Sequence, residues 1–162
     1  MTTVLAERER PTAHRVRHAP ALTAIAPIVP VQNVAVSLRF YVNRLGFETL
    51  QRNPNGSAAL IARGSVRLML IRVPHQRALE ATREHLSAYI WTTDVEALYR
   101  QLAPMLDGLP AHRVRPPFRQ PYGTLEFHVK DPDGFLLFFA EDPSQHVAPD
   151  DNDPSDTATY AH

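Results

Sequence analysis

Short apolar runs alternate with helical stripes along most of this chain. Residues Ile25–Val31 form an apolar segment that two prolines interrupt, which favours a strand at the edge of a sheet. Asn33 then precedes apolar residues at helical spacing, and Gly46 follows the last of them, a pattern typical of a capped helix. Short apolar runs between turn-forming residues predict three further strands. These strands are Phe47–Arg52, Ala58–Ala62 and Val66–Val73.

The same order of elements is predicted a second time after a polar connection, Pro74–His85. Leu86–Thr92 is the expected strand, and Asp94 is the expected cap of a helix that ends before Gly108. Three strands follow, near Ala111–Arg115, at Thr124–Lys130 and at Phe135–Glu141. A period of about 60 residues indicates a duplicated unit. The predicted fold class is therefore α+β, with two βαβββ modules whose uncovered sheet faces surround a shared cavity.

These patterns divide the chain into one domain and two tails. Residues 23–142 form the predicted domain, with modules at 23–73 and 86–142. Residues 1–22 are rich in arginine, and residues 143–162 are rich in aspartate without a Lys or Arg. Both tails lack periodic apolar residues and are predicted to be disordered, basic at one end and acidic at the other.

Composition excludes several classes of function. The chain of 162 residues has no cysteine, so disulfides and thiolate chemistry are excluded. It has no apolar stretch long enough to span a membrane and no secretory signal, so a cytoplasmic protein without membrane contact is expected. A glycine-rich phosphate loop and a nucleophile elbow are also absent. Arg63, Arg67 and Arg72 lack interleaved aromatic residues, so no nucleic-acid partner is expected.

Two motifs resemble those of a known superfamily. Phe40–Phe47 reads FYVNRLGF after the first strand, and Asp131–Gly134 reads DPDG before the last one. Their order on a βαβββ repeat resembles the vicinal-oxygen-chelate proteins, which include glyoxalases, bleomycin-resistance proteins and extradiol dioxygenases. Ala26–Pro27, Ala88–Tyr99 and Gln120–Phe127 make the bleomycin-resistance proteins the most similar group. That resemblance implies a homodimer that exchanges its first strand at Pro27 and holds two ligand crevices at the interface.

The resemblance also implies where a metal would bind. The metalloenzymes of the superfamily hold a divalent ion with His, Glu or Gln side chains from four strands. The corresponding positions in this chain are Ala26, Leu68, Ala88 and Phe138, or residues beside them, and none of these four side chains can ligate a metal. The sequence therefore predicts neither a metal nor any other cofactor.

Strand alternation selects the residues that face the cavity. Phe127 and Val129 are expected to face a helix, so Glu126 and His128 should face the cavity. Trp91 is predicted to lie in the core. The resemblance places Tyr122 where bleomycin-resistance proteins have an aromatic that stacks on the drug. The predicted ligand-binding residues are Tyr122, Phe118, Glu126, His128, Phe138 and Arg67.

Three hypotheses about function follow. The first is a metal-independent, dimeric binding protein that sequesters a planar or aromatic small molecule, such as an antibiotic, with no catalytic residue. The second is a metal-free enzyme of the lyase or isomerase type that uses His128 and Glu126 as acid and base. The third is a regulatory module whose crevice is vestigial. The first predicts binding without turnover, and the second predicts turnover that is lost in His128→Ala.

Overall fold

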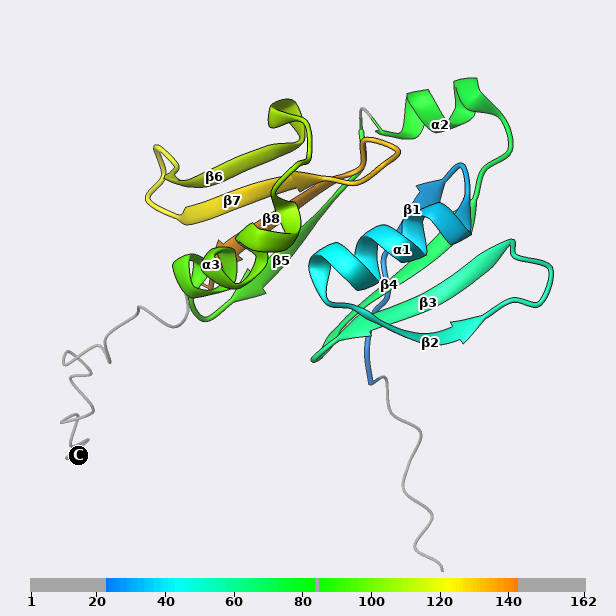
Figure 1. Cartoon of the computed structure of the whole chain (residues 1–162), viewed down its shortest axis with the longest axis horizontal. Helices are drawn as coiled ribbons and strands as arrows, with labels where there is room; N and C mark the ends of the chain where they lie inside the picture. The colour runs from blue at the N-terminus through cyan, green and yellow to red at the C-terminus, as the bar shows by residue number, and fades with distance from the viewer. Residues whose placement is uncertain (1–22, 84, 143–162) are drawn as a thin grey trace, which may run out of the picture.

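The computed structural model describes residues 23–83 and 85–142, which form two four-stranded sheets lying side by side (Figure 1). The first sheet has the order β1-β4-β3-β2, with β1 parallel to β4 and the other pairs antiparallel. We call this sheet and its helix module one. Its elements are β1 (Ile28–Val31), α1 (Val34–Leu45), β2 (Glu48–Arg52), β3 (Ala58–Arg63) and β4 (Val66–Arg72).

The second sheet repeats this arrangement as β5-β8-β7-β6, with β5 parallel to β8. We call it and its helix module two. Its elements are β5 (Ser87–Thr92), α3 (Val95–Leu106), β6 (Val114–Arg119), β7 (Leu125–Lys130) and β8 (Leu136–Glu141). The predicted fold class, α+β with two βαβββ modules, is confirmed.

The ends of both helices follow from the sequence. The Asn33 side chain accepts hydrogen bonds from the backbone N–H groups of Ala35 and Val36, at 2.9 and 3.2 Å. Gly46 ends α1 with φ of 68°, a left-handed conformation that favours glycine. Asp94 accepts a 2.8 Å hydrogen bond from Ala97 and so caps α3. The caps predicted at Asn33 and Asp94 are confirmed.

Two predicted segments differ from the structure. The connection Pro74–His85 contains a helix, α2 (Gln76–Arg83), which its sequence did not predict. Its polar sequence gave little helical pattern because, among residues 76–81, whose burial is described, Leu79 alone lies in the buried core. The strand predicted near Ala111–Arg115 begins only at Val114, because Ala111–Arg113 form a short 3-10 turn, η1.

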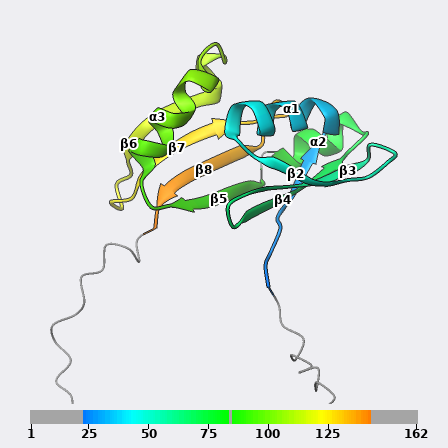
Figure 2. The same cartoon turned by 60° about the horizontal axis from the view of Figure 1, so that its bottom comes forward.

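Helices α1 and α3 lie on the same side of the molecule, above the two sheets (Figure 2). Helix α1 packs against α3, and the Arg44 guanidinium donates to the backbone carbonyls of Met105 and Asp107. The Tyr41 hydroxyl donates a 3.1 Å hydrogen bond to the buried Asp131 carboxylate. Tyr41 and Asp131 belong to the two sequence motifs that lie far apart in the chain, so these motifs meet at the junction between the modules.

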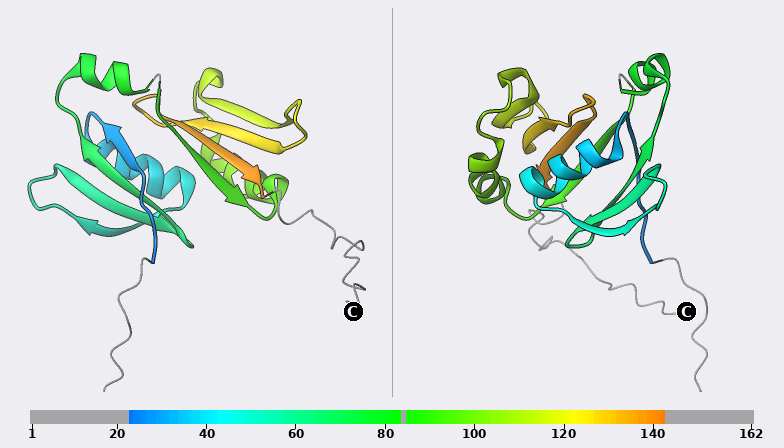
Figure 3. Two further views of the ribbon diagram at one scale, coloured as in Figure 1. Left: turned by 180° about the vertical axis from the view of Figure 1, so that it is seen from behind. Right: turned by 45° about the vertical axis from the view of Figure 1, so that its right-hand side comes forward.

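The faces of the sheets that point away from α1 and α3 are open, as the view from behind shows (Figure 3, left). Ile28 and Trp91, one on each sheet, keep 59% and 50% of their surface exposed. Strand β1 pairs with β4 of its own chain, so its exchange with a second subunit stays a prediction. The predicted tails, 1–22 and 143–162, lie outside the described residues. None of the described helices is long and apolar enough to cross a membrane.

Candidate functional site

Four ring side chains form a row across the open face of module two. They are Tyr89 on β5, Phe138 on β8, His128 on β7 and Phe118 on β6. Tyr89 stacks on Phe138 with a centroid distance of 5.2 Å. The His128 ring meets Phe138 at 4.4 Å and Phe118 at 4.9 Å, both edge to face. We call these four residues the aromatic row.

Strand register and alternation create this row. Phe138 pairs with Tyr89 on one side and with His128 on the other, so their side chains point to the same face of the sheet. Phe127 and Val129, the neighbours of His128, are fully buried on the helix side. The prediction that Phe127 and Val129 face the helix is confirmed.

The row continues at both of its ends. The Trp91 ring lies 4.8 Å from that of Tyr89, and the Arg115 guanidinium lies 3.3 Å from the centroid of the Phe118 ring. The prediction that Trp91 lies in the core is wrong. Ala88 and Ile90 are the buried residues of β5, so strand alternation places Trp91 on the opposite, open face.

A hydrogen-bonded carboxylate lies beneath the row. The Glu126 side chain is fully buried and accepts hydrogen bonds from the Tyr89 hydroxyl, the Gln120 amide and His128 Nε2, the last at 2.6 Å. Burial raises the pKa of the Glu126 carboxyl, but these hydrogen bonds outweigh it, so the pKa lies below its ordinary value. Glu126 is therefore ionised at neutral pH, and it orients the rings of Tyr89 and His128.

The structure brings four of the six predicted ligand-binding residues together, namely Phe118, Glu126, His128 and Phe138. Tyr122 lies in the turn between β6 and β7 and is 67% exposed. Its hydroxyl lies within hydrogen-bonding reach of the Tyr89 hydroxyl, at one end of the row. Burial, together with hydrogen bonds to Glu126 and Tyr122, raises the pKa of Tyr89. Arg67 lies on β4 in the other sheet, away from this row.

Four residues of the site were not predicted: Tyr89, Trp91, Arg115 and Gln120. The sequence did carry a signal for the first two, because both alternate with the buried Ala88 and Ile90. Arg115 and Gln120 gave no such signal. The pairing of β6 with β7 is irregular between Arg115 and Phe118, so simple alternation fails there.

Two of the positions inferred for metal ligands, Leu68 and Ala88, do not lie on the open faces of the sheets. Leu68 and Ala88 are buried in the core on the helix side, so they do not face the cavity. Their neighbours Met69 and Tyr89 alternate with them and face the open side. Within the described ranges, no three His, Cys, Asp or Glu residues come close enough to hold a metal ion. The expectation that the protein binds no metal stays a prediction.

Module one has a hollow on its own open face. It has a volume of about 330 Å³ and is formed by β2, β3, β4 and the turn between β2 and β3. Met69 and Leu60 line it together with polar groups such as Asn53. Arg67 follows the same alternation as Met69 and therefore points to the same side of the sheet.

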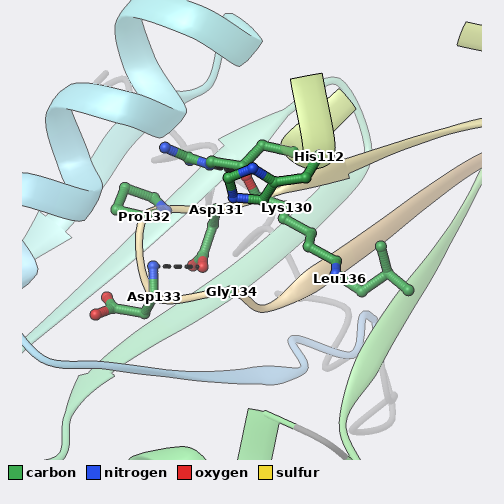
Figure 4. Close-up of a pocket in the computed structure, with 8 residues that line it drawn as sticks. His112, Lys130, Asp131, Pro132, Asp133, Gly134 and Leu136 are labelled. Atoms are coloured by element: carbon green, nitrogen blue, oxygen red, sulfur yellow. Dashed lines mark hydrogen bonds between the residues drawn. The ribbon is translucent and has the colours of Figure 1, made fainter. Parts of the chain in front are cut away.

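A cavity of about 530 Å³ lies at the turn between β7 and β8 (Figure 4). Its carboxylates already have internal partners. Asp131 accepts hydrogen bonds from Tyr41 and from the backbone of Asp133 and Phe135, and Asp133 accepts from the backbone N–H of Gln32. We therefore interpret this cavity as part of the junction between the modules rather than as a ligand site.

Comparison with known proteins gives a consistent result. Residues 21–139 match the family model of the glyoxalase/bleomycin resistance protein/dioxygenase superfamily. No curated relative matches the sequence.

Among solved structures, the chain is similar to the bleomycin-binding protein from bleomycin-producing Streptomyces verticillus, complexed with copper(II)-bleomycin. The TM-score is 0.63 and the identity 27%, over 76% of this chain and 99% of that one. The bleomycin resistance determinant encoded on transposon Tn5 has a TM-score of 0.61 and 23% identity, over 75% and 98% of the two chains. Lactoylglutathione lyase from Agrobacterium tumefaciens has a TM-score of 0.57 and 18% identity, over 78% and 98%. The last two likenesses show the fold alone.

Proposed function

Because the chain belongs to the glyoxalase/bleomycin resistance protein/dioxygenase superfamily, we propose that it is a metal-independent binding protein. It sequesters a planar aromatic small molecule, such as an antibiotic, in a crevice between two subunits. The observation that carries this proposal is the aromatic row, a strip of rings across the open face of module two in which Tyr89 is exposed and the other three rings are partly buried.

The row suits a flat ligand for a physical reason. Stacking needs a π-face on each partner and depends little on the ligand's substituents. Trp91 and Tyr122 extend the surface beyond the Tyr89 end of the row and are 50% and 67% exposed. The similar protein from Streptomyces verticillus was crystallised with copper(II)-bleomycin, which supports a binding role for this chain too. The proposal does not assign bleomycin as the ligand, and bleomycin is one of the compounds to test.

A dimer is part of the proposal, because in a single chain nothing that the structure describes covers the aromatic row. Covering it with the open face of module one from a second copy would bury Trp91 and Ile28, which are both at least half exposed. We expect static light scattering at low micromolar concentration to give twice the chain mass of 18.2 kDa. Deletion of residues 1–20 should leave the dimer intact, whereas deletion of Ile25–Val31 should unfold the protein. A mass near 18 kDa for the full chain would contradict the dimer.

The binding role is tested by binding and turnover together. Bleomycin and a panel of flat heteroaromatic compounds are titrated into the protein by calorimetry, and each compound is then recovered and identified by mass spectrometry. We expect at least one compound to bind saturably and to be recovered unchanged. If no planar aromatic compound binds, the proposed function is wrong.

One observation favours a second candidate, a metal-free enzyme that uses His128 and Glu126. The 2.6 Å contact between them is the geometry in which a carboxylate orients an imidazole for proton transfer. This enzyme would convert a bound compound, and His128→Ala would bind the compound without converting it. Recovery of unchanged compounds from the wild-type protein contradicts this candidate.

A further inference from the structure

We propose that the site selects planar aromatic anions, and that Arg115 binds their acidic group. This inference rests on the proposed function, since it names the chemical class of the ligand that the aromatic row holds. The juxtaposition that carries it is a guanidinium at the Phe118 end of the row, 3.3 Å from the centroid of the ring.

The position of Arg115 leaves its donors available. Its side chain is exposed, and the guanidinium lies over the Phe118 ring. A guanidinium that packs on a ring through its flat face keeps its N–H groups at its edge, where they match the two oxygens of a carboxylate. Among the described residues, no carboxylate lies within ion-pair distance of Arg115.

Neighbouring arginines of module two are used differently. Arg113 donates two hydrogen bonds to the Lys130 carbonyl, at 3.1 and 2.8 Å. Arg119 donates a 2.6 Å hydrogen bond to the Gly123 carbonyl. Arg115 has no such bond to the described part of the protein. Of these three side chains, it is the one that makes no hydrogen bond to the described part of the protein, so all of its donors remain for a ligand.

The carboxylate of the site does not favour a cation. Glu126 is fully buried and already accepts hydrogen bonds from Tyr89, Gln120 and His128. Within the described part of the site, a cationic ligand on the row would therefore find no free carboxylate as its partner, and it would approach the positive charge of Arg115. An anionic ligand can stack on the rings and place its acidic group at the guanidinium edge, which is a charge-assisted contact.

Three probes that share one ring system test the inference. They are naphthoate, naphthamide and naphthylmethylammonium, each substituted at the same ring position, and they carry a negative, zero and positive charge. Dissociation constants are measured by calorimetry for the wild-type chain, for Arg115→Gln and for the control Arg100→Gln. Arg100 is exposed on α3, which covers the other face of the same sheet, so the control makes the same change in net charge away from the row.

We expect the wild-type protein to bind naphthoate most tightly. Arg115→Gln should weaken naphthoate binding by about five- to tenfold and leave naphthamide binding unchanged, because only the anion uses the guanidinium. Arg100→Gln should leave both unchanged. If naphthamide binds as tightly as naphthoate, or if Arg115→Gln leaves naphthoate unaffected, the anion preference is wrong while the aromatic binding site stands. If none of the three probes binds, the proposed function fails, and this inference fails with it.

Discussion

Phe138→Ala is expected to weaken the binding of naphthamide by about 1–3 kcal/mol, the usual cost of removing a central aromatic anchor. Phe138 lies in the middle of the aromatic row, stacked on Tyr89 and in edge contact with His128. Its removal interrupts the surface on which a flat ligand lies. Calorimetric titration of the neutral amide measures this loss without any contribution from the ligand's charge.

Leu136→Ala is the matched control for this substitution. Leu136 lies on the same strand and the same side of the sheet as Phe138, but it lines the cavity at the β7–β8 turn instead of the row. It should leave the dissociation constant unchanged. Thermal unfolding of both variants separates a loss of binding from a loss of folding. Equal affinities of Phe138→Ala and the wild-type protein would show that the ligand binds elsewhere.

The second large effect is a pH dependence of stability that comes from Asp131. Burial raises the pKa of Asp131 from 3.8 to about 6, although hydrogen bonds from Phe135, Tyr41 and Asp133 oppose the shift. Between about pH 4 and pH 6 the folded chain therefore holds a proton that the unfolded chain has released. The contribution of Asp131 to stability is fully present below about pH 4 and is lost as the pH rises through about 6.

Asp131→Asn should remove this dependence, because the amide keeps an acceptor for the backbone N–H groups and does not titrate. Urea unfolding from pH 4 to pH 7 gives the free energy of unfolding for the wild-type and variant chains. Their difference should change by about 3 kcal/mol over this range, with the wild-type protein losing stability relative to the variant as the pH rises. Parallel curves for Asp131→Asn would contradict the expected effect of its burial.

Much of the fold could be predicted because local signals and tertiary structure agree. Asn33, Gly46 and Asp94 delimit their helices through backbone contacts that each residue makes with its neighbours. The apolar strands between turns also form a complete module in each half of the chain. The helix α2 escaped prediction because its sequence shows no apolar stripe, and Leu79 is the one residue among 76–81 that is buried.

Strand alternation predicts only some of the residues of the candidate site. Alternation placed His128 correctly, since β7 is regular and both of its neighbours are apolar. The same rule applied to β5 would have put Tyr89 and Trp91 on the open face, because Ala88 and Ile90 are its buried positions. On β6 the shift in register between Arg115 and Phe118 breaks the rule. The contact between Arg115 and the Phe118 ring therefore had to be found in three dimensions.

The central claim is that a planar aromatic ligand lies on the aromatic row of module two. Trp91 is the only tryptophan of the chain, and its ring lies 4.8 Å from that of Tyr89 at one end of the row. The most direct test is therefore a nuclear magnetic resonance titration that follows the single indole N–H signal of the ¹⁵N-labelled protein as naphthoate is added. We predict that this signal shifts and saturates with the dissociation constant that calorimetry gives for the same probe. If calorimetry shows binding while the indole signal stays in place, the ligand does not lie on this row.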